Sequence, residues 1–150
     1  MTTAEEKIIV YTDGGSRGNP GPAAAGVVVK DPAGRMIKSF GKALGTATNN
    51  EAEYAAVVLG LQKVKALLGK EKIKNMRVEM RMDSQLVCRQ LSGGYKIEQE
   101  RLFPYFIKVW NLKMDFGEVL FSHVPREQNR EADTEVNRAL DREQGELFVR

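Results

Sequence analysis

The sequence predicts a single α/β domain built on a mixed β-sheet. Three short strand-like segments come first and are joined by turn-rich stretches, which favours an antiparallel meander. Strand-like and helix-like segments then alternate over the rest of the chain, as in layered α/β domains. A length of 150 residues, with 42% hydrophobic and 29% charged, suits one globular domain. We expect this domain to span residues 1–150, with 1–6 and 143–150 as terminal tails.

The first three strands are predicted from short apolar runs. Residues 7–12, Lys-Ile-Ile-Val-Tyr-Thr, are apolar and rich in β-branched side chains. They end at a loop, 13–22, that contains several glycines and prolines. A second strand follows near 24–30 and, after a turn at 31–34, a third follows near 36–43. Such short connections place consecutive strands side by side and antiparallel.

A long amphipathic helix is expected next. It begins after Thr48, which can form a capping box with Glu51, and runs to about Leu68, where Gly69 terminates it. Residues 76–82 then alternate between apolar and charged side chains, as in a strand with one buried face.

The last part of the chain continues the alternation. We expect helices over 84–91, 101–114 and 129–142, and a strand over 119–124. Three aromatic residues fall within helical patterns and are expected to pack in the core: Tyr54, Tyr105 and Trp110.

Composition excludes several classes of protein. No apolar run approaches the roughly 20 residues that a bilayer span needs, so no membrane contact is expected. The single cysteine, Cys88, precludes an internal disulfide, and one cysteine with one histidine cannot build a zinc site alone. We expect a monomer in the cytoplasm, in which carboxylates hold any metal. The net charge of +3 is compatible with a polyanionic substrate.

Four acidic residues occupy positions where a surface role is hard to explain. Asp13 and Asp83 each follow an apolar strand, whereas Glu53 and Asp133 lie in the first turns of amphipathic helices. Glu53 heads an apolar stripe that must face the sheet. Each acid alone has an ordinary explanation, as a turn residue, a cap or an acid favoured by the helix dipole. Strict alternation would also turn Asp83 toward the charged face of its strand.

Together the four acids predict a metal centre. Strand ends and helix starts can meet at one edge of a sheet, where clustered carboxylates repel one another unless a cation binds. Oxygen ligands alone select a hard ion such as Mg²⁺, with Mn²⁺ as a substitute. A pair of such ions is a general device for in-line attack on a phosphodiester.

Four segments of the chain resemble the motifs of type 1 ribonucleases H, also named ribonuclease HI. They are 11–22, which begins Tyr-Thr-Asp-Gly-Gly-Ser, 48–53, Thr-Asn-Asn-Glu-Ala-Glu, 83–85, Asp-Ser-Gln, and 129–133, Asn-Arg-Glu-Ala-Asp. The segments occur in the family's order and span nearly the whole chain. The resemblance implies a ribonuclease H-like α/β fold: a five-stranded mixed sheet, its first three strands antiparallel, with helices on both faces.

The resemblance also implies an endonuclease that hydrolyses the RNA strand of RNA/DNA hybrids and leaves 3′-hydroxyl and 5′-phosphate ends. The family's acids, which bind two metal ions, fall on Asp13, Glu53, Asp83 and Asp133. Positions that contact the hybrid fall on Gly14, Gly15, Ser16, Asn19, Thr48, Asn49, Asn50 and Gln85. Neutral amides suit contact with a 2′-hydroxyl, which both donates and accepts hydrogen bonds. Plain turn formation explains the glycines equally well, and helix capping explains Thr48.

The chain departs from the family pattern in two places. Larger members insert a basic helix and loop before the last strand, whereas 93–114 has room for a turn and one helix, as in the compact form that lacks this basic protrusion. The loop before the last acid normally carries a histidine, but here 124–128 is short and His123 falls in the strand pattern. We therefore expect Arg126 to take part of the phosphate-facing role, with His123 as a second auxiliary candidate.

Two other functions stay open. A non-catalytic module could bind hybrids or double-stranded RNA, although it would have no reason to keep all four acids. A nuclease on the same fold could act on DNA as an exonuclease or a junction resolvase. Against it, segments 14–16 and 49–50 match the residues that contact hybrids.

Overall fold

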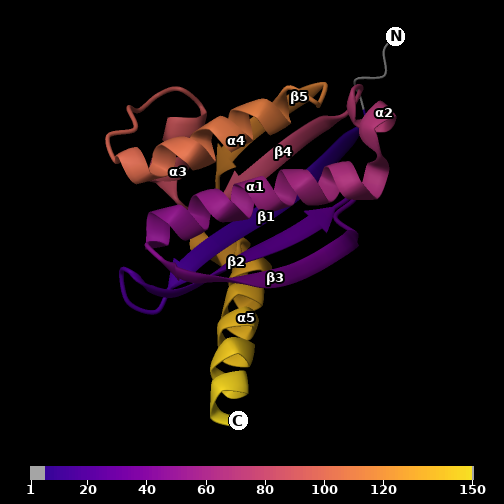
Figure 1. Ribbon diagram of the computed structural model, residues 1–150. Coiled ribbons are helices and arrows are strands. Elements are labelled where there is room, and N and C mark those ends of the chain that lie inside the picture. Colours follow the sequence, from indigo (N-terminus) through magenta and orange to yellow (C-terminus); the bar gives the residue numbers. More distant parts are fainter. Residues whose placement is uncertain (1–5, 150) are drawn as a thin grey trace.

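The computed structural model describes residues 6–149, and side chains among them up to Gly145. Its strands form a five-stranded sheet in the order β3-β2-β1-β4-β5 (Figure 1). β1, β2 and β3 pair antiparallel, whereas β1 with β4 and β4 with β5 pair in parallel. The bounds are Lys7–Ser16 for β1, Gly21–Lys30 for β2, Met36–Ala47 for β3, Arg77–Met82 for β4 and Glu118–His123 for β5. The expected mixed sheet with an antiparallel start is confirmed.

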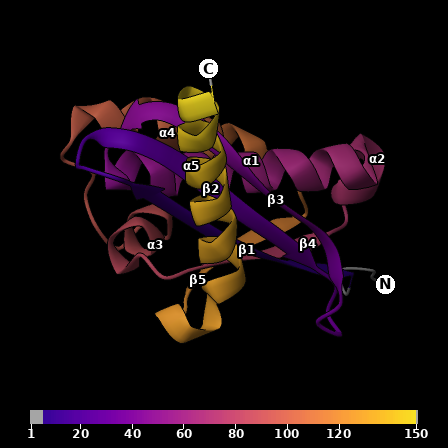
Figure 2. The ribbon, with the colours of Figure 1, turned by 90° about the horizontal axis from the view of Figure 1, so that it is seen from below.

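Helices cover both faces of this sheet. α1 and α4 lie on one face, and α5 crosses β1, β2 and β3 on the other, as Figure 2 shows. The helix bounds are Asn49–Leu68 for α1, Lys70–Ile73 for α2, Gln85–Leu91 for α3, Phe103–Lys113 for α4 and Arg130–Val149 for α5, with 3₁₀ turns at Glu100–Leu102 and Arg126–Gln128. Among the helices described, none has the length and apolarity to cross a membrane.

The last two helices differ from the expected ones at their ends. A 3₁₀ turn precedes α4, and Pro104 lies in its first turn, where a missing N–H costs no helical hydrogen bond. α5 continues past the expected end at Arg142 as far as Val149, because the following segment contains Glu and Gln, which favour helix. Residues 143–149 are therefore helical, while residues 1–5 of the other expected tail lie outside the described residues.

The prediction that Trp110 packs in the core is wrong, because its side chain is 51% exposed. α4 instead directs Val109 and Phe106 toward the core, which carries Trp110 to the outer side of the helix. Tyr54 is fully buried and Tyr105 packs against the core, as expected. More than one stripe of α4 is apolar, so helical spacing alone could not select the buried one.

The start of α1 is fixed by the predicted capping box. The Glu51 N–H donates to Thr48 Oγ1 at 3.1 Å, and the Thr48 N–H donates to Glu51 Oε1 at 2.9 Å. The stripe that was expected to face the sheet, Glu53, Val57 and Val64, is buried. The helix therefore presents a carboxylate to the sheet one turn after its first residue.

Two glycines allow helices to contact the sheet through main-chain atoms. Gly14 follows Asp13 on β1, and a Cβ at Gly14 would lie 2.2 Å from the backbone of Ala52 in α1. Gly26 pairs with Asp13 across β1 and β2, and a Cβ there would lie 2.2 Å from the carbonyl oxygen of Ala132 in α5. These close approaches hold α1 and α5 against the sheet beside Asp13.

Candidate metal centre

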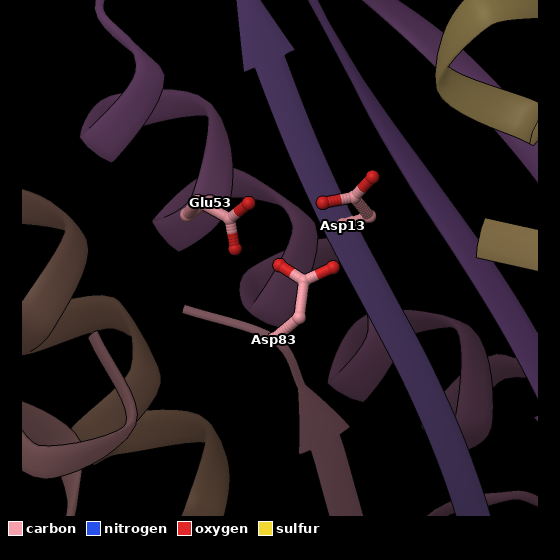
Figure 3. A group of neighbouring side chains, drawn as sticks. All are labelled: Asp13, Glu53 and Asp83. Carbon is pink, nitrogen blue, oxygen red and sulfur yellow. The ribbon is translucent and has the colours of Figure 1, made fainter. Parts of the chain in front are cut away.

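Three carboxylates meet at one end of the parallel strand pair β1 and β4. Asp13 lies on β1, Glu53 in α1 and Asp83 directly after β4, and Figure 3 shows their carboxylates turned toward one another. Each offers an oxygen atom within 4.8 Å of the other two. The side chains of Asp13 and Glu53 are buried, and Asp83 is half-buried.

Asp83 lies on the face of the sheet to which the alternation of β4 assigns it. Tyr11 pairs with Arg81 in the parallel register of β1 and β4, so Asp13 and Asp83, each two residues further on, share one face. The Asp83 carboxylate faces Asp13 and Glu53 there (Figure 3). The charged face of β4 is therefore the face on which the carboxylates meet.

Burial and neighbouring charges raise the pKa values of Asp13 and Glu53. Burial raises the pKa of Asp13 to about 7, and the charges of Asp83 and Asp133 raise it as well, against a hydrogen bond with Glu53. Burial, and next the charge of Asp13, raise the pKa of Glu53 well above its ordinary value. Within the part of the chain that the structure describes, no Lys or Arg pairs with the three carboxylates. A bound cation would supply the missing positive charge.

The main chain adds a hydrogen bond that orients this cluster. The Gly14 N–H donates to Glu53 Oε1 at 3.1 Å. Because α1 contacts the backbone of Gly14, the same residue sets both the approach of the helix and the orientation of its carboxylate. The position of Glu53 relative to Asp13 therefore follows from backbone geometry.

Asp133, the fourth predicted acid, lies near the cluster but outside it. It is exposed in the first turn of α5 and lines the same cavity as the three clustered acids. Its charge is one of the causes that raise the pKa of Asp13. The structure thus brings together three of the four predicted acids and places the fourth at the border.

A cavity of about 670 Å³ opens over the carboxylates. Besides the four acids, the predicted residues that line it are Gly14, Gly15, Ser16, Asn49, Asn50 and Arg126. The predicted residues Asn19, Thr48, Gln85 and His123 are not part of its wall. Sequence motifs therefore located most of the cavity wall.

Two of the predicted amide side chains have bonds within the protein. Asn19 Oδ1 accepts the N–H of Asn49 at 2.9 Å, and Asn49 Oδ1 accepts the N–H of Ser16 at 2.9 Å. These bonds tie the loop between β1 and β2 to the first residue of α1. Thr48 is occupied by the capping box, and Gln85 is exposed at the start of α3.

His123 and Arg126 are placed differently. His123 is the last residue of β5, pairs with Met82 and is exposed. Arg126 begins the 3₁₀ turn that follows and lines the cavity. The assignment of His123 to a strand, made from the alternation of side chains, is confirmed.

Sequence reasoning missed several residues of the wall, which are Arg17, Ser84, Glu127, Arg130, Val136, Asn137 and Leu140. Asn137 and Leu140 could have been found, because they follow Asp133 at helical spacing. Arg17 could not, since it reaches α5 across the fold: its guanidinium donates to Gln144 Oε1 at 2.7 Å and pairs with Asp141 at 2.8 Å.

Comparisons with known proteins match most of the chain. A family model described as "Reverse transcriptase-like" matches residues 11–139. Ribonuclease HI of Halobacterium salinarum is 39% identical over 135 residues, which cover 90% of this chain and 65% of that protein. The chain thus spans somewhat less than two thirds of that relative's length.

Solved structures agree with this match. LC11-RNase H1, isolated from compost by a metagenomic approach, is 42% identical with a TM-score of 0.86, and the match covers 93% of this chain and 99% of that one. A second structure, LC11-RNase H1 in complex with RNA/DNA hybrid, matches with the same identity of 42% and TM-score of 0.86, over 91% of this chain and 99% of that one.

Proposed function

Because this chain belongs to the type 1 ribonuclease H family, we propose that it hydrolyses the RNA strand of RNA/DNA hybrids and leaves 3′-hydroxyl and 5′-phosphate ends. One observation carries the proposal: three buried or half-buried carboxylates lie with oxygen atoms within 4.8 Å of one another, beneath an open cavity. A relative 42% identical to the chain has a structure in complex with RNA/DNA hybrid, which supports the choice of substrate.

The residues at the cluster fit divalent cations. Asp13, Glu53 and Asp83 offer only carboxylate oxygens, the ligands that Mg²⁺ and Mn²⁺ prefer, and Asp133 borders them. We propose that these four acids hold two ions, Mg²⁺ or Mn²⁺ in its place. When bound, such ions supply an acidified water and stabilise charge on the leaving 3′ oxygen. The protein supplies the negative charge that binds them and a cavity of about 670 Å³ for the phosphate.

Neutral polar groups around the acids are suited to an RNA strand. Ser16, Asn49 and Asn50 line the cavity together with Gly14 and Gly15. Amide and hydroxyl groups can both donate to and accept from a 2′-hydroxyl, which DNA lacks. We therefore propose these residues as the RNA contacts, with Asn19, Thr48 and Gln85 at the periphery.

Cations at the cavity rim are suited to phosphates. Arg17, Arg126 and Arg130 lie in the wall, and Arg126 belongs to the short turn just before α5. His123 ends a strand outside this wall, so we assign the phosphate-facing role to Arg126. Hybrid binding should accordingly weaken as salt is added. That the protein acts as a monomer in the cytoplasm is part of this proposal and rests on the sequence alone.

The test is a cleavage assay on four end-labelled substrates: an RNA/DNA hybrid, duplex RNA, single-stranded RNA and duplex DNA. Each is incubated with Mg²⁺, Mn²⁺ or a chelator. We expect metal-dependent cutting of the RNA strand of the hybrid, no cutting with chelator, and intact single-stranded RNA and duplex DNA. Equal cutting of duplex DNA would indicate a different nuclease, and tight hybrid binding without cutting would indicate a binding module.

A further inference from the structure

Asn129 is a buried amide at the junction of three elements. Its side chain is 1% exposed, and it lies between the turn Arg126–Gln128 and the start of α5. Nδ2 donates to the carbonyl oxygen of Thr12 at 2.9 Å and to Asp83 Oδ2 at 3.2 Å. It is not among the residues that line the cavity above the acids.

The orientation of this amide is determined by its partners. An NH₂ group carries two hydrogens, and here two acceptors face it, a carbonyl and a carboxylate. The reversed amide would place an oxygen against both acceptors, which is repulsive. The backbone carbonyl of Asn129 also accepts the N–H of Asp133 at 3.1 Å.

These bonds link Asn129 to three of the four acids. Thr12 directly precedes Asp13 on β1, Asp83 is contacted through its carboxylate, and Asp133 through its backbone. The three acids come from strands and a helix far apart in the sequence. Asn129 is thus a single residue that connects β1, the end of β4 and the start of α5.

We propose that Asn129 is a positioning residue that orients Asp83 and sets its place relative to Asp13 and Asp133 for binding divalent cations, an inference that rests on the proposed function. A neutral donor suits this task, because it directs a carboxylate without cancelling its charge. A Lys or Arg in the same place would neutralise the carboxylates itself and would therefore weaken the binding of a divalent cation.

The test is calorimetric titration of the substrate-free protein with Mn²⁺, comparing the natural chain with Asn129→Ala and Asn129→Ser. We expect the Mn²⁺ dissociation constant to rise by about 10–100-fold in Asn129→Ala, the scale for losing a partner that orients a metal ligand. In cleavage assays at saturating Mn²⁺, kcat should fall while KM for hybrid stays within about twofold, since Asn129 does not line the cavity.

A control separates positioning from general destabilisation. Leu61 is fully buried in the apolar core, two turns of α1 after Glu53, so Leu61→Ala lowers stability without removing a hydrogen bond of Asn129. Its Mn²⁺ dissociation constant should equal that of the natural chain at temperatures where both are folded. Unchanged Mn²⁺ affinity in both Asn129 variants would overturn the proposal, as would an equal loss in Leu61→Ala.

A measurement on the natural chain covers the case in which the variants do not fold. The side-chain amide signals of Asn129 should shift on adding Mg²⁺, with the midpoint given by calorimetry. Signals that stay fixed while Mg²⁺ binds would overturn the positioning role. Failure of the natural chain to bind Mg²⁺ or Mn²⁺ would instead overturn the proposed function itself.

Discussion

Two acidic sites in this protein have opposite electrostatic properties. One is the cluster at the end of β1 and β4, and the other is Glu79 within β4. At one end, Asp13 and Glu53 face each other without a cation, and burial raises the pKa of Asp13 to about 7. Further along β4, Glu79 accepts from Arg81 Nε at 2.8 Å and from Lys7 Nζ at 3.0 Å. The hydrogen bond from Arg81, and then that from Lys7, lower the pKa of Glu79 to about 2 despite partial burial.

The opposite pKa shifts of Asp13 and Glu79 distinguish a ligand-binding acid from a structural acid. Glu79 has its positive partners within the chain, so the folded protein gains from its ionised form. Burial disfavours the ionised forms of Asp13 and Glu53, and only a cation from solution would favour them. Carboxylates on neighbouring elements thus have opposite roles, and a Lys or Arg paired with the carboxylate distinguishes the structural acid from the ligand-binding ones.

The largest expected effect is on catalysis. Asp13→Asn or Asp83→Asn should lower kcat on hybrid by on the order of 10³-fold or more, because each removes charge that holds the metal. Glu79→Gln changes the same functional group at the paired site and should leave kcat within about twofold. Steady-state rates with saturating Mg²⁺ measure both, and a comparable loss in Glu79→Gln would abolish the distinction.

The second prediction concerns stability as a function of pH, measured with chelator. Asp13 holds its proton in the folded chain up to about 7 but loses it near 3.8 when unfolded, so the metal-free protein should lose stability as pH rises between these values. Asp13→Asn should flatten this part of the profile and leave the melting temperature equal or higher at neutral pH.

Glu79 should show the opposite sign. Its pKa is about 2 in the folded chain against an ordinary 4.5, so its contribution is complete above 4.5 and is lost as pH falls toward 2. Glu79→Gln should therefore be less stable than the natural chain at neutral pH and approach it in acid. Thermal melts in which both variants respond alike would contradict the comparison.

Substrate contacts are expected to have a smaller effect. Asn50→Ala and Gln85→Ala should raise KM for hybrid by the equivalent of ~1–3 kcal/mol, the scale of a specific polar contact to a base edge. Asn50 lines the cavity and Gln85 does not, so the loss should be at least as large for Asn50. Hybrid affinity that is unchanged in both variants would remove them from the substrate contacts.

The smallest effect is expected at His123. His123→Ala should retain activity within about tenfold, below the typical loss of a general acid or base, because the residue ends a strand outside the cavity. Arg126→Ala should lower activity at least as much, since Arg126 lines the cavity. A fall for His123→Ala as deep as that for Asp133→Asn would assign the histidine to the reaction.

Local patterns located the strands, the helices and the four acids, because periodicity and capping act between near neighbours in the chain. The same patterns misplaced Trp110, where α4 offers two apolar stripes and only its packing selects one. They also could not reveal that Asn129 contacts Thr12 and Arg17 contacts Asp141, since each pair is more than a hundred residues apart. Contacts of that range depend on the assembled fold.

The main-chain contacts at Gly14 and Gly26 limit which residues can change while the metal centre is kept. Because α1 and α5 meet the sheet there through backbone atoms, any side chain at either glycine would push a helix, and the acid that it carries, away from Asp13. Replacement of these residues is therefore closed to a lineage that keeps the metal centre. A designer who recasts the core for heat resistance should hold both glycines constant.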